Sequence, residues 1–243
     1  MSADPCADTP GFSTSTPDRA QVLQDLIDSR FSCRDFVDKQ VPRETIELMF
    51  TLAQKSASWC NTQPWEVIVT SGTETERFRH DLMASIMAGG EVSDTTTDFE
   101  GPAGYFGRYA ERRREAGWAL YEAVGVERGD RAASARQSLR NFELFGAPHV
   151  AIITTNADHN VYGALDAGVY LGNLLLVAES LGLGAIAQAA LATQGTFIRE
   201  FFDIPEDRKI LVGMSFGYPN RSAAANSFRT RRADLTDVVR WRG

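Results

Sequence analysis

Residues 162–184 read YGALDAGVYLGNLLLVAESLGLG, and this stretch decides what kind of fold the chain can form. It has the length of a long helix and is apolar nearly all round, with Asp166, Asn173 and Glu179 as its few polar points. A helix that is apolar on every side lies in the middle of a domain rather than on its surface. We therefore expect a long buried central helix around which the rest of the chain is organised.

Strands and further helices are expected in the sequence both before and after this helix. Short apolar runs bounded by turn residues predict strands at 64–72, 148–156 and 209–219. Strands separated by helices indicate α+β or α/β layering around one sheet. The other helices expected from the spacing of apolar residues are 18–27, 41–57, 73–90, about 105–123, about 131–145 and 197–208.

The chain is expected to form one domain over residues 18–243, because no linker or internal repeat divides it. Residues 1–17 are rich in Ser, Thr, Pro, Asp and Gly, which is typical of a flexible tail. They carry neither the basic nor the apolar region of a signal peptide. Residues 220–243 form a C-terminal extension that is irregular and basic for most of its length.

Composition excludes several classes of protein. The net charge of −7 argues against a general nucleic-acid binder, which needs a basic surface to neutralise phosphates. No run of 18 or more apolar residues occurs, so we expect no membrane span. Cys6, Cys33 and Cys60 form no even disulfide framework, which fits a reducing compartment. We therefore expect a soluble cytoplasmic protein.

Residues 91–145 allow two interpretations. A loop at 91–104 is followed by two arginine-rich helical segments that carry many aromatic side chains. These aromatics either pack the helices together or form a mobile lid over a flat ligand. They are Phe99, Tyr105, Phe106, Tyr109, Trp118, Tyr121, Phe142 and Phe145.

The polar segment SASWCNTQPWEVIV at 56–69 raises a question about Cys60. A thiol among polar neighbours resembles a nucleophile, but a nucleophilic cysteine needs a base, and no histidine lies near it in sequence. The segment is otherwise a polar loop that holds something else, and this interpretation is favoured. A spatial partner for Cys60 stays possible at this stage.

Common catalytic and binding motifs are absent. The sequence has no phosphate-binding P-loop, no HExxH and no GxSxG, and GLGAIA at 182–187 follows a helix instead of opening one. His80, His149 and His159 lack companion ligands at metal spacing, so solvated or packing roles are expected and a metal site is not.

Two basic clusters lie at opposite ends of the chain. In SRFSCRDF, Arg30, Ser32 and Arg34 alternate, so in an extended segment they share one face and can grip a phosphate. NSFRTRRADL carries Arg229, Arg231 and Arg232. Each cluster alone is as readily a solvated surface, but the two could converge on one anion.

Taken in order, these stretches resemble the FMN-dependent nitroreductase family. The segments that carry the resemblance span about residues 24–240 and include a late AQAAL, GYPN and NSFRTRR. These late segments are similar to those of the nitrobenzoate-reductase and mycobacterial NfnB-like subgroup. The resemblance implies an α+β fold with a central, mainly antiparallel sheet flanked by helices. It also implies an interlocked homodimer with two FMN molecules at the subunit interface.

The resemblance assigns cofactor-binding positions at both ends of the chain. Arg30, Ser32 and Arg34 match the family's phosphate-binding positions. Arg229 and Arg232 match a second phosphate clamp, with Arg231 as an alternative.

The middle of the chain supplies the remaining matches. Asn61 matches the residue that binds the flavin's polar edge or ribityl chain, and Gln63 lies beside it. Ser58 and Trp59 match positions that reach the flavin of the partner subunit. The backbone of Ala187, Gln188, Ala189 and Ala190 matches the segment facing N5 and O4 of the ring, although relatives commonly have Pro where this chain has Ala187.

The implied activity is reduction of nitroaromatic or quinone-type compounds by NADPH or NADH in a ping-pong scheme through N5 of FMN. The chemistry is then carried by the flavin, so no catalytic side chain is expected. Two alternatives follow from the same resemblance: a relative acting on an enoate or on flavin itself, and a flavin-storing protein without turnover. A Cys60 hydrolase is the alternative outside the family.

Overall fold

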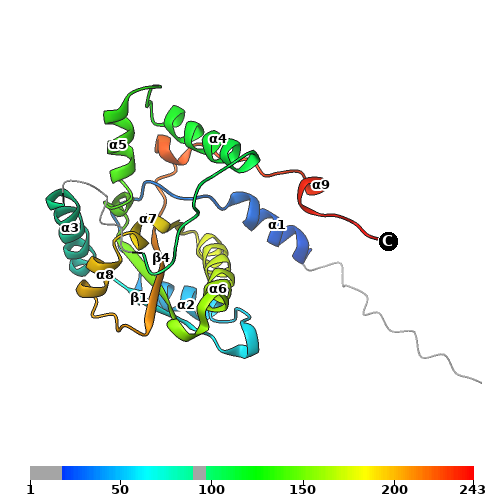
Figure 1. The fold of residues 1–243 in the computed structure, drawn as a ribbon, viewed down its shortest axis with the longest axis horizontal. Helices are drawn as coiled ribbons and strands as arrows, with labels where there is room; N and C mark the ends of the chain where they lie inside the picture. Colours follow the sequence, from blue (N-terminus) through cyan, green and yellow to red (C-terminus); the bar gives the residue numbers. More distant parts are fainter. Residues whose placement is uncertain (1–17, 90–96) are drawn as a thin grey trace, which may run out of the picture.

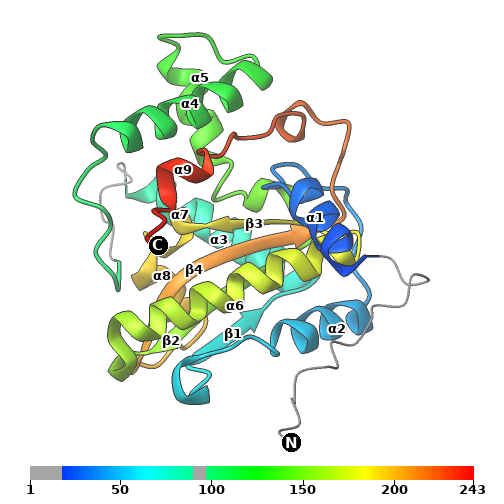
Figure 2. The same ribbon diagram turned by 90° about the vertical axis from the view of Figure 1, so that its right-hand side faces the viewer.

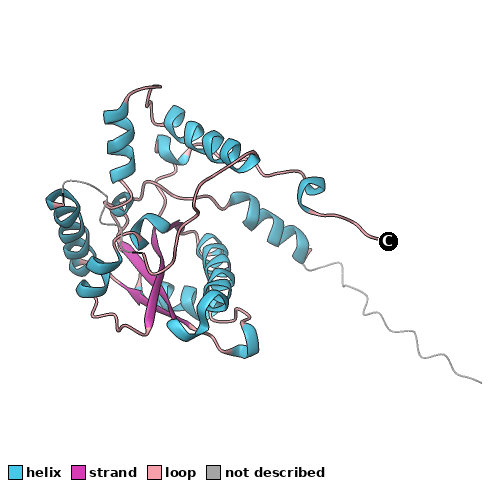
Figure 3. Ribbon diagram, viewed as in Figure 1, coloured by secondary structure: helices cyan, strands magenta, loops and turns pink. Residues whose placement is uncertain are grey.

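The computed structural model describes residues 18–89 and 97–243 (Figure 1). The predictions for the tail at 1–17 and for the first part of the loop, 91–96, concern residues outside these ranges. Along the chain one or more helices separate each strand from the next, and the strands are gathered in one sheet (Figure 3).

Over the described residues the sheet has four strands in the order β1-β2-β4-β3, and every neighbouring pair is antiparallel. The expected mainly antiparallel α+β fold is therefore confirmed. The strands are β1 (Trp65–Val69), β2 (His149–Asn156), β3 (Gly184–Gln188) and β4 (Arg208–Gly217). The strand β3 was not predicted, because GAIAQ has only one β-branched residue and follows directly on the helix end.

Helices cover both faces of the sheet (Figure 2). On one face, α2 (Arg43–Ala53) and α6 (Asn160–Ser180) pack on Ala151 and Ile153 of β2. On the other, α3 (Thr73–Ala88) and α8 (Gly195–Phe201) pack on Val150 and Ile152. Because successive strand residues point to opposite faces, β2 contributes alternately to the two cores. The remaining helices are α1 (Arg19–Ser29), α4 (Arg108–Ala123), α5 (Arg131–Leu139), α7 (Ala189–Ala192) and α9 (Leu235–Val238).

The long helix α6 is buried along one face only. Asp166, Tyr170 and Leu174 lie on the buried face, whereas Leu165 is 62% exposed and Val169 is 43% exposed. The predicted long central helix is therefore present, and within residues 18–89 and 97–243 no element covers its second apolar face. The helix at Ala157–Ser180 is long and apolar enough to cross a membrane by length and composition. Its buried face against the sheet is, however, that of a core helix.

Some aromatic side chains of the arginine-rich region fit the packing interpretation, and others do not. Phe142 and Phe145 are buried in the cores, as the packing interpretation expects. Tyr105, Phe106 and Tyr109 are exposed, and neither α4 nor α5 buries a residue. These helices project above the body of the molecule (Figure 1).

His149 occupies a buried site at the start of β2 and stacks on Phe216 at 5.1 Å between ring centroids. Its Nε2 accepts a hydrogen bond from Val41 N–H at 3.0 Å, which leaves the proton on Nδ1, 3.2 Å from Thr70 O. Burial lowers the pKa of His149 below its ordinary 6.5, although the Thr70 hydrogen bond opposes the shift. The predicted packing role is therefore confirmed.

This site predicts a pH-dependent stability. Below about pH 6.5 the unfolded chain binds a proton that the folded chain still excludes, so the free energy of unfolding should fall as the pH drops. Above pH 6.5 the effect of His149 on the free energy of unfolding should no longer change with pH. Urea unfolding at pH 7.5 and 5.5 checks this, with His149→Gln as the control that lacks the titrating group. A wild-type loss no larger than that of His149→Gln would contradict it.

Candidate functional site

The two basic clusters converge in one pocket of about 620 Å³. Arg30, Ser32 and Arg34 line it from one side, and Arg229 and Arg232 line it from the C-terminal segment. The wall between them comes from α6, through Gly172, Leu175 and Leu176. The structure therefore brings together five predicted phosphate-binding residues that lie about 200 positions apart in sequence.

The backbone around Arg30, Ser32 and Arg34 explains their shared face. Ser32 forms a bridge with Ala185 of β3, and Cys33 N–H donates to Ala185 O at 3.1 Å. The segment is thus extended along the outer edge of β3, which places alternate side chains on one side.

Asn226 joins the two clusters, and it was not among the predicted site residues. Its Oδ1 accepts from Arg34 N–H at 2.7 Å, while its Nδ2 donates to Asp35 O and Asn220 O, each at 2.8 Å. Asn226 is buried, so this clip is internal. An isolated Asn in a basic tail carries no sequence signal for such a role.

The pocket concentrates positive charge. Burial lowers the pKa of Arg30, the charge of Arg232 lowers it further, and Glu179 opposes this. Burial also lowers the pKa of Arg34. Within the described ranges, neither arginine forms an ion pair with a carboxylate. A bound dianion would relieve the repulsion and use the free N–H donors, so these residues fit a phosphate.

Aromatic rings hold two of the guanidinium groups. Arg229 lies over Phe31 at 4.1 Å from the ring centroid, and Arg34 lies 5.6 Å from that of Phe228. Such contacts orient a cation while leaving its N–H groups available. Phe31 and Phe228 were not among the predicted site residues.

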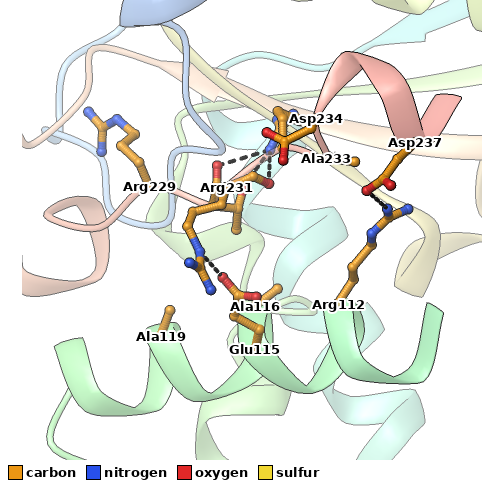
Figure 4. A pocket seen from close by; sticks show the side chains of 11 residues that line it. Arg112, Glu115, Ala116, Ala119, Arg229, Arg231, Ala233, Asp234 and Asp237 are labelled. Carbon is orange, nitrogen blue, oxygen red and sulfur yellow. Dashed lines mark hydrogen bonds and ion pairs between the residues drawn. The ribbon is translucent and has the colours of Figure 1, made fainter. Parts of the chain in front are cut away.

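Arg231 points away from this pocket. It donates to Glu115 of α4 at 2.6 Å and lines a second pocket of about 610 Å³ (Figure 4). Arg112 of the same helix pairs with Asp237 at 3.8 Å. Arg229 and Arg232 line both pockets, so of the three C-terminal arginines they are the ones placed with Arg30.

The loop at 56–63 has a strained backbone. Cys60, Asn61 and Gln63 have φ values of 50°, 56° and 47°, in the left-handed region that non-glycine residues rarely adopt. Strain of this kind clusters at ligand-binding and catalytic sites. The indole of Trp59 is 56% exposed beside it. The loop therefore has the character of a binding loop.

The polar side chains of this loop differ in availability. Gln63 accepts from Gln54 Nε2 and donates to Asn61 O, and Ser58 Oγ accepts from Gln63 N–H. The side chain of Asn61 is exposed and makes no hydrogen bond to any residue that the structure describes. Asn61 is thus the predicted residue most available to a ligand, whereas Ser58 and Gln63 shape the loop.

Cys60 is exposed, and no histidine serves it as a base. His149 bonds to the backbone and Ser71, His80 to Asp81, and His159 to Asn156. Among residues 18–89 and 97–243, no group of histidine, cysteine and carboxylate ligands could hold a metal ion. The alternative of a catalytic thiol at Cys60 therefore has no support in this geometry.

The segment from Ala187 to Ala190 offers backbone groups at an open edge. Ala185 O bonds to Cys33, so the peptide groups of Ala185 face away from β4, and alternation places those of Ala187 at the same outer edge. Ala187 and Ala189 are exposed. The side chain of Gln188 is buried and bonded to Asn141 O and Ser215, so it stabilises the core.

Known proteins resemble this chain in sequence over most of its length. Residues 27–218 match the sequence model of the nitroreductase family. The nitroreductase NfnB of Mycolicibacterium smegmatis is 34% identical over 93% of this chain and 95% of its own length. The 4-nitrobenzoate reductase of Nocardioides sp. is 32% identical over 87% of this chain and 86% of its own.

Solved structures agree with the sequence comparison. The crystal structure of the FMN-dependent nitroreductase NfnB from Mycobacterium smegmatis in complex with NADPH superposes with a TM-score of 0.86. The superposition covers 93% of this chain and all of that one, at 34% identity. The similarity to the nitrobenzoate-reductase and NfnB-like subgroup is thereby confirmed.

Proposed function

The chain belongs to the nitroreductase family, and we propose that it is an FMN-dependent NAD(P)H oxidoreductase that reduces nitroaromatic and quinone-type compounds. The observation that carries this proposal is the cationic pocket in which Arg30, Ser32 and Arg34 meet Arg229 and Arg232. That donor set suits the phosphate of FMN.

The remaining site residues have complementary roles in this proposal. FMN, when bound, supplies the hydride chemistry, with the nicotinamide donor and the nitro acceptor using its ring in turn. The open-edge N–H of Ala187 and the side-chain amide of Asn61 would hold the polar edge of the flavin. Fixed donors of this kind stabilise negative charge that develops on a bound ring. The absence of a side-chain acid–base pair is then expected.

The protein acts in this proposal as a homodimer. The uncovered face of α6 carries Leu165 and Val169, with Gly168 and Gly172 beside them and open space where a side chain would stand. Glycine in a helix interior is unfavourable, so its presence here favours close approach of another helix. The helix α1 likewise exposes Val22, Leu23 and Ile27. A cytoplasmic location without nucleic-acid or membrane partners stays part of the proposal.

The purified protein tests the proposal directly. It should be yellow, release FMN on denaturation, and oxidise NADPH or NADH only when a nitroaromatic such as 4-nitrobenzoate is added. A colourless protein that takes up no added FMN would contradict it. Bound FMN without nitroaromatic-dependent turnover would favour a storage protein, and turnover with an enoate or free flavin alone would favour another family reaction.

The variant Cys60→Ser separates the flavoenzyme from a thiol hydrolase in the same assay. Turnover should stay within about threefold of the wild type, since no base serves the thiol. Loss of all turnover, together with normal FMN content, would return Cys60 to the chemistry.

A further inference from the structure

Asp166 is a buried carboxylate in the middle of an otherwise apolar helix, and it lines neither of the two pockets described above. It is 7% exposed, and both of its oxygens lie 3.1 Å from Trp59 N, which donates to them. Removing a carboxylate from water costs free energy. The burial of Asp166 in α6 must therefore be offset by another interaction in the structure.

We propose that Asp166 is a positioning residue for the cofactor. It holds the strained loop at 58–63 in the one conformation that presents Asn61 outward, and it thereby sets the affinity for FMN without contacting the flavin. This inference rests on the proposed function, because it assumes that the loop meets FMN.

The backbone of the loop shows why an anchor is required. Three of the four consecutive positions 60–63, Cys60, Asn61 and Gln63, are non-glycine residues that adopt positive φ. Such conformations persist only where the surroundings determine them. The hydrogen bond to Asp166 is made at Trp59, immediately before the first strained residue, where it fixes the entry of the chain into the turn.

Further contacts from α6 secure the same loop. The ring of Trp59 packs edge-on against Tyr162, with centroids 4.2 Å apart, one helical turn before Asp166. Asn173 Nδ2 donates to Ser56 Oγ at 2.8 Å, at the unstrained start of the segment. Asp166 is therefore the polar anchor of the strained part, and Asn173 is a matched anchor outside it.

The charge and the two oxygens of Asp166 both matter. A single N–H shared between two carboxylate oxygens is held centrally and by a charged acceptor, which makes a stronger hydrogen bond than a neutral amide would. In Asp166→Asn one acceptor oxygen stays and the charge is lost. The effect of this variant should lie between those of the wild type and Asp166→Ala.

Hydrogen exchange and FMN release together test the proposal. In Asp166→Ala, amide exchange in a peptide covering 57–64 should accelerate at least about tenfold. FMN affinity, from the fluorescence of flavin released on dilution of the purified protein, should fall by roughly tenfold or more. KM for the nitroaromatic should stay nearly constant in flavin-saturated protein, since no substrate contact is lost.

The control Asn173→Ala should leave FMN affinity within about threefold, although it removes a side-chain hydrogen bond from the same helix to the same segment. An equal loss of FMN in both variants would overturn the proposal, because Asp166 would then act only through general stability. Unchanged exchange and unchanged affinity in Asp166→Ala would overturn it as well.

Two remaining outcomes are also decided. If Asp166→Ala does not fold, Asp166→Asn carries the test, and wild-type exchange and affinity in that variant would overturn the proposal. If the wild-type protein binds no FMN, the proposed function fails first and this inference with it. Faster exchange in Asp166→Ala would then report only a structural anchor.

Discussion

Replacing Arg30 and Arg34 together with alanine should leave the purified protein almost free of FMN. Both guanidinium groups line the cationic pocket, and neither is neutralised by a carboxylate in the described residues. A hydrogen bond to a charged group contributes about 1.5–3 kcal/mol, so two of them lower the affinity by roughly 10²–10⁴-fold. Titration of flavin-free protein with FMN, followed by quenching of flavin fluorescence, measures the loss.

Arg231→Ala is the matched control for this double variant. Arg231 belongs to the same basic segment as Arg229 and Arg232, but its guanidinium pairs with Glu115 and lines the other pocket. Both side chains of that ion pair are largely exposed, and exposed ion pairs contribute little to the stability of the fold. FMN affinity should therefore change by less than about threefold. A loss comparable to that of the double variant would show that the phosphate binds on the α4 side of the segment.

Much of the fold was predictable because it depends on local patterns. The strands at β1, β2 and β4 are apolar runs bounded by turn residues, and the helices have regular apolar spacing. The strand β3 was missed because its residues are small. It is a strand only because β4 pairs with it on one side and the segment around Cys33 on the other. Pairing of this kind is a tertiary property.

In the candidate site, too, local patterns could be predicted from the sequence, whereas contacts between distant residues could not. Alternation in SRFSCRDF placed Arg30, Ser32 and Arg34 on one face correctly, because it follows from extended backbone alone. The choice among the C-terminal arginines stayed open in sequence, since it depends on where Glu115 of α4 lies. Asp166, Asn173 and Glu179 stand out in the sequence as the polar residues of the long helix, but the sequence predicts no role for them. Asp166 meets Trp59, a residue 107 positions away, and no local pattern encodes that contact.

The uncovered face of α6 carries the remaining large prediction, that one charge there abolishes the proposed homodimer. Leu165 and Val169 are four residues apart and therefore lie on the same side of the helix, both exposed in the single chain. A carboxylate at Val169 would be buried unpaired against the partner's apolar surface, at a cost of several kcal/mol. Val169→Glu should thus weaken dimerisation by about 10³-fold or more.

Sedimentation velocity at micromolar protein concentration distinguishes the outcomes, and Ala84→Glu is the control. Ala84 is exposed on α3, on the opposite face of the sheet, so this variant adds the same charge away from the proposed interface. We expect a dimeric wild type, a dimeric Ala84→Glu and a monomeric Val169→Glu with unchanged helical circular dichroism. The monomer should also lose FMN, because the sequence resemblance implies that Ser58 and Trp59 reach the flavin of the partner subunit. A dimeric Val169→Glu would place the interface elsewhere, and an FMN-replete monomer would show that each chain completes its own site.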